Sequence, residues 1–274
     1  MGVGLFLFRT LSLAGSALAA EHAVAEDLIA KPALPETTPQ ESWTGVHVGV
    51  SIGARLSDAR WTTDCLAPEA LPATCPNDSF GGGTRIGNDN SASFDNDVPR
   101  VGAYLGFDWQ AARLVLGIEG EAAWADDSRT RVGIPGTWST DFGPDFDAAR
   151  IESAWDASVR ARVGFLLTPK TLVYSTGGLA LLHYEVSGTC GGTFPVGWCV
   201  VPNVDSESVI AAGWTAGGGV ERMLPHAWII RGEYRYSDYG SQSFTLFEDE
   251  ALDSIGVTIE QKTSLAYVGV SRRF

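Results

Sequence analysis

Histidine, serine and carboxylate side chains are the groups with which this chain could carry out acid–base or nucleophilic chemistry. Such catalysis needs a nucleophile and a base on converging faces of the fold. The candidate for such a site is His183, with Glu185 and Ser187 close by in the sequence, but no His-x-Ser pair occurs anywhere in the chain. We therefore expect no catalytic residues, no enzyme activity and no cofactor. The other histidines are His22, His47 and His226.

The four cysteines form two spaced pairs, Cys65 with Cys75 and Cys190 with Cys199. Neither pair has the Cys-x-x-Cys spacing of a zinc or redox site, and no histidine cluster lies nearby. We therefore predict no metal site. Two local disulfides, formed in an oxidising compartment, are the favoured arrangement among the three pairings that four cysteines allow.

The chain is acidic, with a formal net charge of -14, and poor in charged residues, at 19%. Phosphate backbones are bound by basic surfaces, so this balance argues against nucleic acid as a partner. We interpret the clusters of acidic residues as solvent-exposed side chains of loops. Binding of divalent cations is the alternative.

The N-terminal part has the features of an export signal followed by a linker. Residues 1–20 contain one charge, Arg9, an apolar run and an Ala17-Leu18-Ala19 cleavage motif. Residues 21–42 have no apolar period and three prolines, which is typical of a disordered periplasmic linker. Beyond residue 20 no run of 18 apolar residues occurs, so no transmembrane helix is expected. Residues 43–274 form the remaining domain.

This domain repeats an alternation of apolar and polar residues with a period of two. In 43–54, Val46, Val48, Val50 and Ile52 alternate with glycine, histidine and serine. A period of two predicts strands with two different faces. Similar segments follow at 101–109, 114–124, 155–165, 172–186, 210–222, 227–239 and 262–274.

The connections between these segments alternate between short and long. The short ones are 110–113, 168–171 and 223–226, and the long ones are about 55–99, 125–152, 187–208 and 240–260. Outer-membrane barrels have tight periplasmic turns and long external loops. We therefore predict an all-β, eight-stranded antiparallel up-and-down transmembrane β-barrel with long external loops. A soluble barrel with inward aromatic residues is the alternative.

The two strand faces suggest different surroundings. The apolar face should meet lipid, with aromatic residues near its borders. We place on it Trp43, Trp109, Trp124, Trp155, Tyr174, Tyr184, Trp214, Trp228, Tyr234 and Tyr236.

The polar face should line a narrow lumen, where charges must pair or stay hydrated. The predicted lumen ion network is Glu119, Glu121, Asp156, Arg160, Arg162, His183, Glu185, Arg231, Glu233 and Arg235, with Asp108 and Glu221 also inward. If the 168–171 turn sets the register, Asp156 faces His183, and we hypothesise that they pair. The network either plugs the barrel or leaves a thin, cation-favouring water path along surplus carboxylates.

The segment 43–49, Trp-Thr-Gly-Val-His-Val-Gly, resembles the opening motif of small alphaproteobacterial outer-membrane β-barrels, the porin-like major surface proteins. Residues 172–180, 213–221 and 232–240 are similar to later strands of that family. The resemblance covers residues 43–274, with departures at His47, where the family usually has tyrosine, and at Arg272. It implies the outer membrane of a Gram-negative cell. Phe274 is similar to the terminal aromatic residue of that family, which the barrel-assembly machinery recognises.

From these observations we expect a structural surface barrel with at most weak porin activity towards small solutes. The alternative is a surface barrel that binds haem or a host molecule through its external loops. A lipid-modifying barrel enzyme is a third class. The expected partners are outer-membrane lipids, lipopolysaccharide and the barrel-assembly machinery, with self-association left open.

Overall fold

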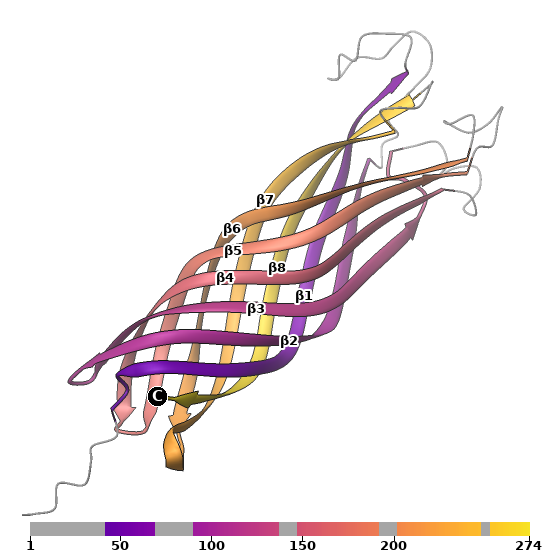
Figure 1. The fold of residues 1–274 in the computed structure, drawn as a ribbon. Helices are drawn as coiled ribbons and strands as arrows, with labels where there is room; N and C mark the ends of the chain where they lie inside the picture. The colour runs from indigo at the N-terminus through magenta and orange to yellow at the C-terminus, as the bar shows by residue number, and fades with distance from the viewer. Residues whose placement is uncertain (1–41, 69–89, 137–146, 192–201, 248–252) are drawn as a thin grey trace, which may run out of the picture. The chain divides into compact units, whose positions relative to one another are not determined.

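The computed structural model describes residues 42–68, 90–136, 147–191, 202–247 and 253–274 (Figure 1). Residues 1–41, with the predicted export signal and nearly all of the predicted linker, lie outside this part. Within it, no helix is both long and apolar enough to cross a membrane.

The described residues form eight antiparallel strands that close into one barrel in sequence order. Strand β1 closes the ring by pairing with both β2 and β8, so that Val50 lies between Ala103 and Val270. The predicted fold is therefore confirmed. The strands are β1 Gly45–Pro68, β2 Ser91–Ala111, β3 Leu114–Val132, β4 Ala148–Thr168, β5 Thr171–Cys190, β6 Asn203–Met223, β7 Trp228–Leu246 and β8 Asp253–Arg273.

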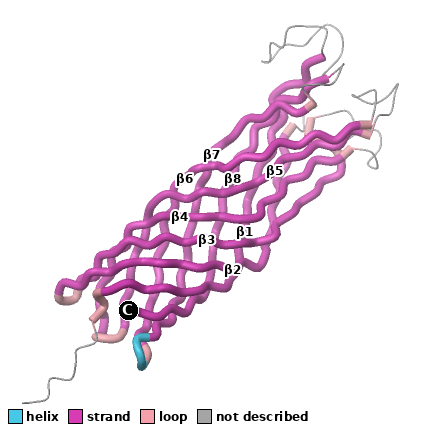
Figure 2. The backbone as a smooth tube through the Cα atoms, in the orientation of Figure 1, coloured by secondary structure: helices cyan, strands magenta, loops and turns pink. Residues whose placement is uncertain are grey.

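One end of the barrel carries the short connections and the start of β1. The β2–β3 and β4–β5 turns lie there, as does η1, Pro225–Ala227, between β6 and β7 (cyan in Figure 2). The C-terminus lies at the same end, where the Phe274 backbone N–H donates to the Val46 carbonyl at 2.8 Å. Short turns mark the periplasmic end of such barrels, so the long connections face outwards from the cell.

Each strand is 5 to 12 residues longer than its predicted segment, because it continues beyond the apolar stretch, so parts of the expected long loops are strand. On β1 the outward positions change from Val50 and Ile52 to Asp58 and Arg60, while the inward positions change from Ser51 to the fully buried Ala59 and Trp61. The half of the barrel near the short turns is thus apolar outside and polar inside. The half near the long connections has the opposite arrangement, like a water-soluble sheet. The first half spans the bilayer, for which about 9–11 residues per strand suffice.

The interior consists of three layers. At the periplasmic end a small apolar cluster includes Trp43, Leu166, Leu172 and Ile229. At the outer end a larger apolar cluster includes Trp61, Phe94, Ile151, Tyr184 and Ile259. Buried charged side chains fill the space between these clusters.

Candidate functional site in the barrel interior

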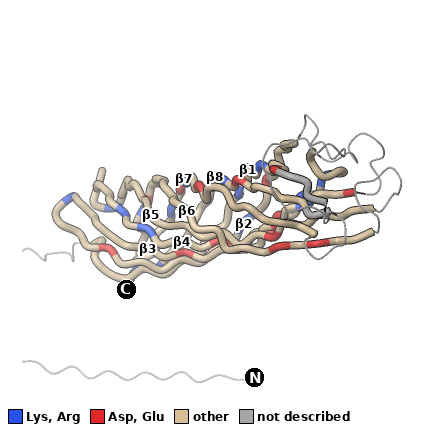
Figure 3. The backbone as a smooth tube through the Cα atoms, turned by 90° about the horizontal axis from the view of Figure 1, so that it is seen from above, with Lys and Arg blue, Asp and Glu red and all other residues tan. Residues whose placement is uncertain are grey.

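The charged layer is built from inward positions of neighbouring strands, where every second residue faces the lumen. Glu119 and Glu121 on β3 lie opposite Arg160 and Ser158 on β4. Arg231, Glu233 and Arg235 alternate along β7 in the same way. Figure 3 marks the acidic and basic positions along the strands.

Glu119 is the centre of the layer. Nη1 and Nη2 of Arg231 donate to its two carboxylate oxygens at 2.9 and 2.7 Å. Arg160 Nη2 donates to Oε1 at 2.6 Å, and Arg162 Nη1 donates to Oε2 at 3.2 Å. The His47 ring Nε2 lies 3.0 Å from Oε2. One buried carboxylate therefore joins side chains from β1, β4 and β7.

Glu121 is a second centre, one inward position nearer the outer end. It accepts hydrogen bonds from Arg235 Nη1 at 2.6 Å, Arg100 Nη1 at 2.7 Å and Arg160 Nη2 at 3.0 Å. Arg160 also donates to Glu233, so this arginine links three carboxylates. The layer is thus one continuous network.

The network extends in both directions along the barrel axis. Towards the outer end, Arg100 forms a two-pronged ion pair with Asp156, and Arg55 Nη2 donates to the Ser153 carbonyl at 3.0 Å. Towards the periplasmic end, Arg273 Nη2 lies 2.8 Å from Asp108. Two arginines also lie over aromatic rings, Arg231 over Tyr104 at 4.0 Å and Arg162 over Tyr174 at 4.3 Å.

The charges in this layer nearly balance. Within the described ranges, the buried ion pairs join seven carboxylates to eight guanidinium groups. Unpaired buried charges are costly, whereas paired and hydrogen-bonded ones are tolerated. The carboxylate surplus expected from the sequence is absent from the described interior, and with it the basis for a cation-favouring path. The members are Asp108, Glu119, Glu121, Asp127, Asp156, Glu221, Glu233, Arg55, Arg100, Arg129, Arg160, Arg162, Arg231, Arg235 and Arg273.

Eight of the ten predicted network residues lie in this layer, and His183 and Glu185 do not. Asp156 lies opposite Leu182 instead of His183. The reason is a register shift between Leu166 and Thr168, which adds one residue to β4 next to the turn. A shift of one residue moves every side chain of the partner strand to the other face.

His183 instead faces outwards and stacks on Trp155, with ring centroids 5.5 Å apart. The proposed Asp156–His183 pair is therefore wrong. The same change of face applies to Tyr174 and Tyr184, which were expected to meet lipid and are buried in the interior. Trp43, before β1, is also buried, and its Nε1 donates to the Pro169 carbonyl at 3.0 Å.

Several network members were not predicted because their positions fell in the expected loops. Arg55 and Asp127 belong to the outer continuations of β1 and β3, and Arg100 directly precedes the predicted start of its strand. The signal that could have found Arg55 is its place in the odd-numbered inward series of β1, after His47 and Ser51. Arg273 belongs to the inward series of β8, next to the outward Arg272.

The remaining predicted site residues are only partly within the described chain. Cys190 ends β5 and is buried, and Cys65 lies in β1, whereas Cys75 and Cys199 are outside the described residues. The two disulfides stay predictions. Phe274 is 73% exposed at the barrel rim, and its part in assembly also stays a prediction. In the described part of the chain, no group of three or more metal-ligating side chains occurs.

Comparison with known proteins shows which group this barrel falls into. The model of the family described as "Outer membrane protein beta-barrel domain" matches residues 10–274. The chain belongs to this family. It is an outer-membrane protein, as the resemblance of its strands implied.

Several members of the outer-membrane β-barrel family are similar to this chain. The 25 kDa outer-membrane immunogenic protein of Brucella abortus is 27% identical, over 89% of this chain and 84% of that protein. The 22 kDa outer membrane protein of Rhizobium leguminosarum is 28% identical, over 58% of this chain and 64% of that protein. Among solved structures, OprG of Pseudomonas aeruginosa matches with a TM-score of 0.46 and 9% identity, over 86% of this chain and 99% of that chain.

Proposed function

We propose that this outer-membrane barrel is a structural surface protein whose lumen is closed to small solutes. The observation that carries this proposal is the layering of the interior. A nearly balanced ion network fills the middle of the barrel, and an apolar cluster closes each end of it. Apolar constrictions interrupt a water path by dewetting, and both clusters consist mainly of apolar side chains.

The outer half of the barrel supports the same proposal. Its strands continue past the bilayer with buried apolar side chains inside, such as Trp61 and Phe94, whose rings lie 6.1 Å apart. A packed interior makes this half a stiff support for the loops that follow each strand. Such a support would hold those loops at the cell surface, which is the role we propose for it.

The alternative of a ligand-binding surface barrel depends on the external loops, most of which lie outside the described residues. Haem or a host molecule therefore stays an expectation from the sequence, as do lipopolysaccharide and the barrel-assembly machinery as partners.

Planar-bilayer recording of the folded protein tests the proposal. We expect no discrete current steps from the unmodified protein. The double variant Trp61→Ala with Leu172→Ala, one residue from each apolar cluster, is the opened counterpart, and rare small steps from it would support closure by the clusters. Regular steps of one size from the unmodified protein would reject a closed lumen.

A further inference from the structure

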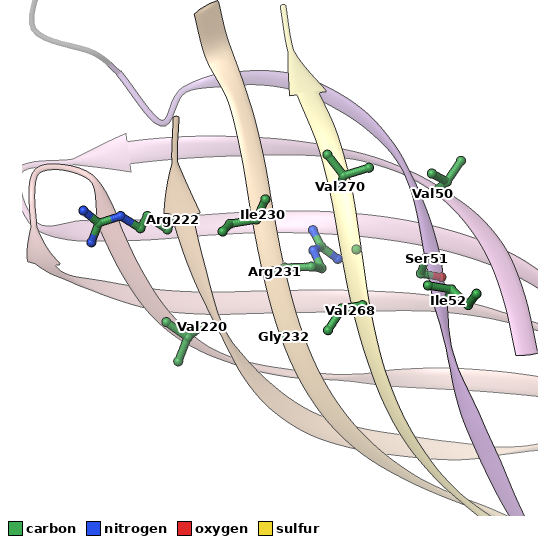
Figure 4. A pocket seen from close by; sticks show the side chains of 11 residues that line it. Val50, Ser51, Ile52, Val220, Arg222, Ile230, Arg231, Gly232, Val268 and Val270 are labelled. Carbon is green, nitrogen blue, oxygen red and sulfur yellow. The ribbon is translucent and has the colours of Figure 1, made fainter. Parts of the chain in front are cut away.

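The lipid-facing side of β6, β7, β8 and β1 contains a groove of about 560 Å³ (Figure 4). The groove exists because Gly232 of β7 has no side chain at an outward position between Val220 and Val268 of the neighbouring strands. A Cβ atom at Gly232 would have nothing within 4 Å. The side chains around it are apolar: Val50, Ile52, Val220, Ile230, Val268 and Val270.

The groove has a basic residue at its periplasmic end. Arg222, which lines the groove, pairs in register with Ile230 of β7, and in Figure 4 its side chain extends away from the valines. Arg272 pairs with Trp228 one outward position further towards the periplasm, and its guanidinium lies 5.5 Å from the Phe274 ring centroid. Both side chains are exposed.

These two arginines differ from those of the interior in having no counter-charge. Within the described residues, neither Arg222 nor Arg272 forms an ion pair with a carboxylate, whereas each interior arginine has at least one. A charge that faces lipid is tolerated where its long side chain can reach the headgroup region. In the headgroup region, the anionic group available to pair with an arginine is a lipid phosphate.

We propose that the groove and the two arginines form a binding site for one anionic phospholipid of the periplasmic leaflet. An acyl chain lies over Gly232, and the headgroup phosphate is bound by Arg222 and Arg272. Strands β6 and β8 are separated only by β7, so the two arginines start about 10 Å apart across the sheet and about 7 Å apart along it, or about 12 Å in all. Two extended arginine side chains can bridge this distance. The planar guanidinium group matches the oxygens of a phosphate.

A second groove on the lipid face shows what sets this one apart. It measures about 700 Å³ and is lined mainly by apolar residues of β1 to β5, including Val48, Leu105, Gly120 and Leu179. No lysine or arginine lines it. It can therefore hold an acyl chain without selecting a headgroup, and it provides an internal comparison.

Native mass spectrometry of the folded full-length barrel tests the site, with phosphatidylglycerol and phosphatidylethanolamine of equal chain length as the probes. We expect the unmodified protein to retain phosphatidylglycerol preferentially. Both lipids carry a phosphate, but the ammonium group of phosphatidylethanolamine offsets its charge, whereas phosphatidylglycerol keeps a net negative charge. Replacing both arginines by Arg222→Gln and Arg272→Gln should therefore lower the preference about tenfold, since the attraction of the two cations for that net charge is lost. The variant Gly232→Leu should reduce retention of both lipids, because it fills the groove.

Two matched controls separate this site from general effects. Arg113→Gln removes an exposed arginine from the β2–β3 turn at the same end of the barrel, and Gly120→Leu fills the second groove. Neither should change the preference for phosphatidylglycerol. Equal retention of the two lipids by the unmodified protein, or an equal loss of preference in Arg113→Gln, would overturn the proposal. Folding of each variant is verified by its shifted migration on unheated SDS gels, and the outcome does not depend on whether the lumen conducts ions.

Discussion

Glu119 on β3 and Arg160 on the adjacent strand β4 are register partners on the inner face of the barrel, with Arg160 Nη2 2.6 Å from Glu119 Oε1, and both side chains are buried. The strand register brings them together across 41 residues of sequence. Arg231 approaches the same carboxylate from β7, 112 residues away. The stability of the barrel therefore depends on this carboxylate in a way that can be measured.

Glu119→Ala should lower the free energy of unfolding by about 3–5 kcal/mol, since it leaves several buried arginines without their main counter-charge. Urea unfolding in lipid vesicles, followed by migration on unheated SDS gels, measures the change. Glu185→Ala is the control, because Glu185 faces outwards and its loss should change stability by no more than about 0.5 kcal/mol. Similar losses in the two variants would contradict the central place of Glu119.

The pair formed by Arg100 and Asp156 should show strong energetic coupling. Asp156→Leu alone leaves Arg100 and Arg55 short of a buried partner and should cost about 3–5 kcal/mol. Adding Arg100→Met should recover most of that loss, because an apolar pair needs no counter-charge. A double-mutant cycle on the free energy of unfolding gives the coupling energy, and strictly additive effects would mean that the pair does not form.

The lipid-facing position of Val50 predicts a strong effect of charge. Val50→Arg should destabilise the barrel by about 2–4 kcal/mol, the cost of a cation near the middle of the bilayer. Ser208→Arg, on the exposed outer continuation of β6 and opposite Glu185, should have little effect. Refolding yield and urea unfolding in vesicles compare the two variants. Equal tolerance of both would mean that the bilayer does not cover Val50.

The outer half of the barrel should lose order when its core is opened. Trp61 is fully buried among apolar side chains, so Trp61→Ala should cost about 3–5 kcal/mol. Because the damage lies outside the bilayer, hydrogen exchange should increase in the outer parts of β1 and β2 and remain slow near Val50. Arg60→Ala, at the adjacent exposed position, should leave exchange unchanged. Uniformly faster exchange along β1 would argue against a separate outer core.

The disulfides predicted from the sequence can be mapped directly. Non-reducing digestion of the protein purified from the cell envelope should yield one linked peptide with Cys65 and Cys75 and another with Cys190 and Cys199. Alkylation before and after reduction counts the free thiols. Linked peptides that join the first pair to the second would replace the local pairing.

The amino-acid sequence by itself determined the strands of this barrel and, for most of them, which face is inward. On β1 the valines at 46, 48 and 50 alternate with small polar residues, and this local rhythm defines both a strand and its two faces without reference to any other part of the chain. Past Leu56 the sequence pattern predicts a loop, and only the structure shows that β1 continues there with its faces exchanged, with Asp58 and Arg60 outward and Ala59 and Trp61 inward. Eight of the ten expected network residues were found from this alternation of inward and outward positions alone.

The tertiary structure decided which side chains meet. One extra residue between Leu166 and Thr168 reverses the faces of β5, whose two faces are both apolar near Leu181 and Leu182, so the local pattern could not resolve them. Closure of the ring then brought Arg231 to Glu119 and Arg273 to Asp108. Such contacts depend on the register of every strand pair around the barrel, which cannot be predicted from the sequence of any single segment.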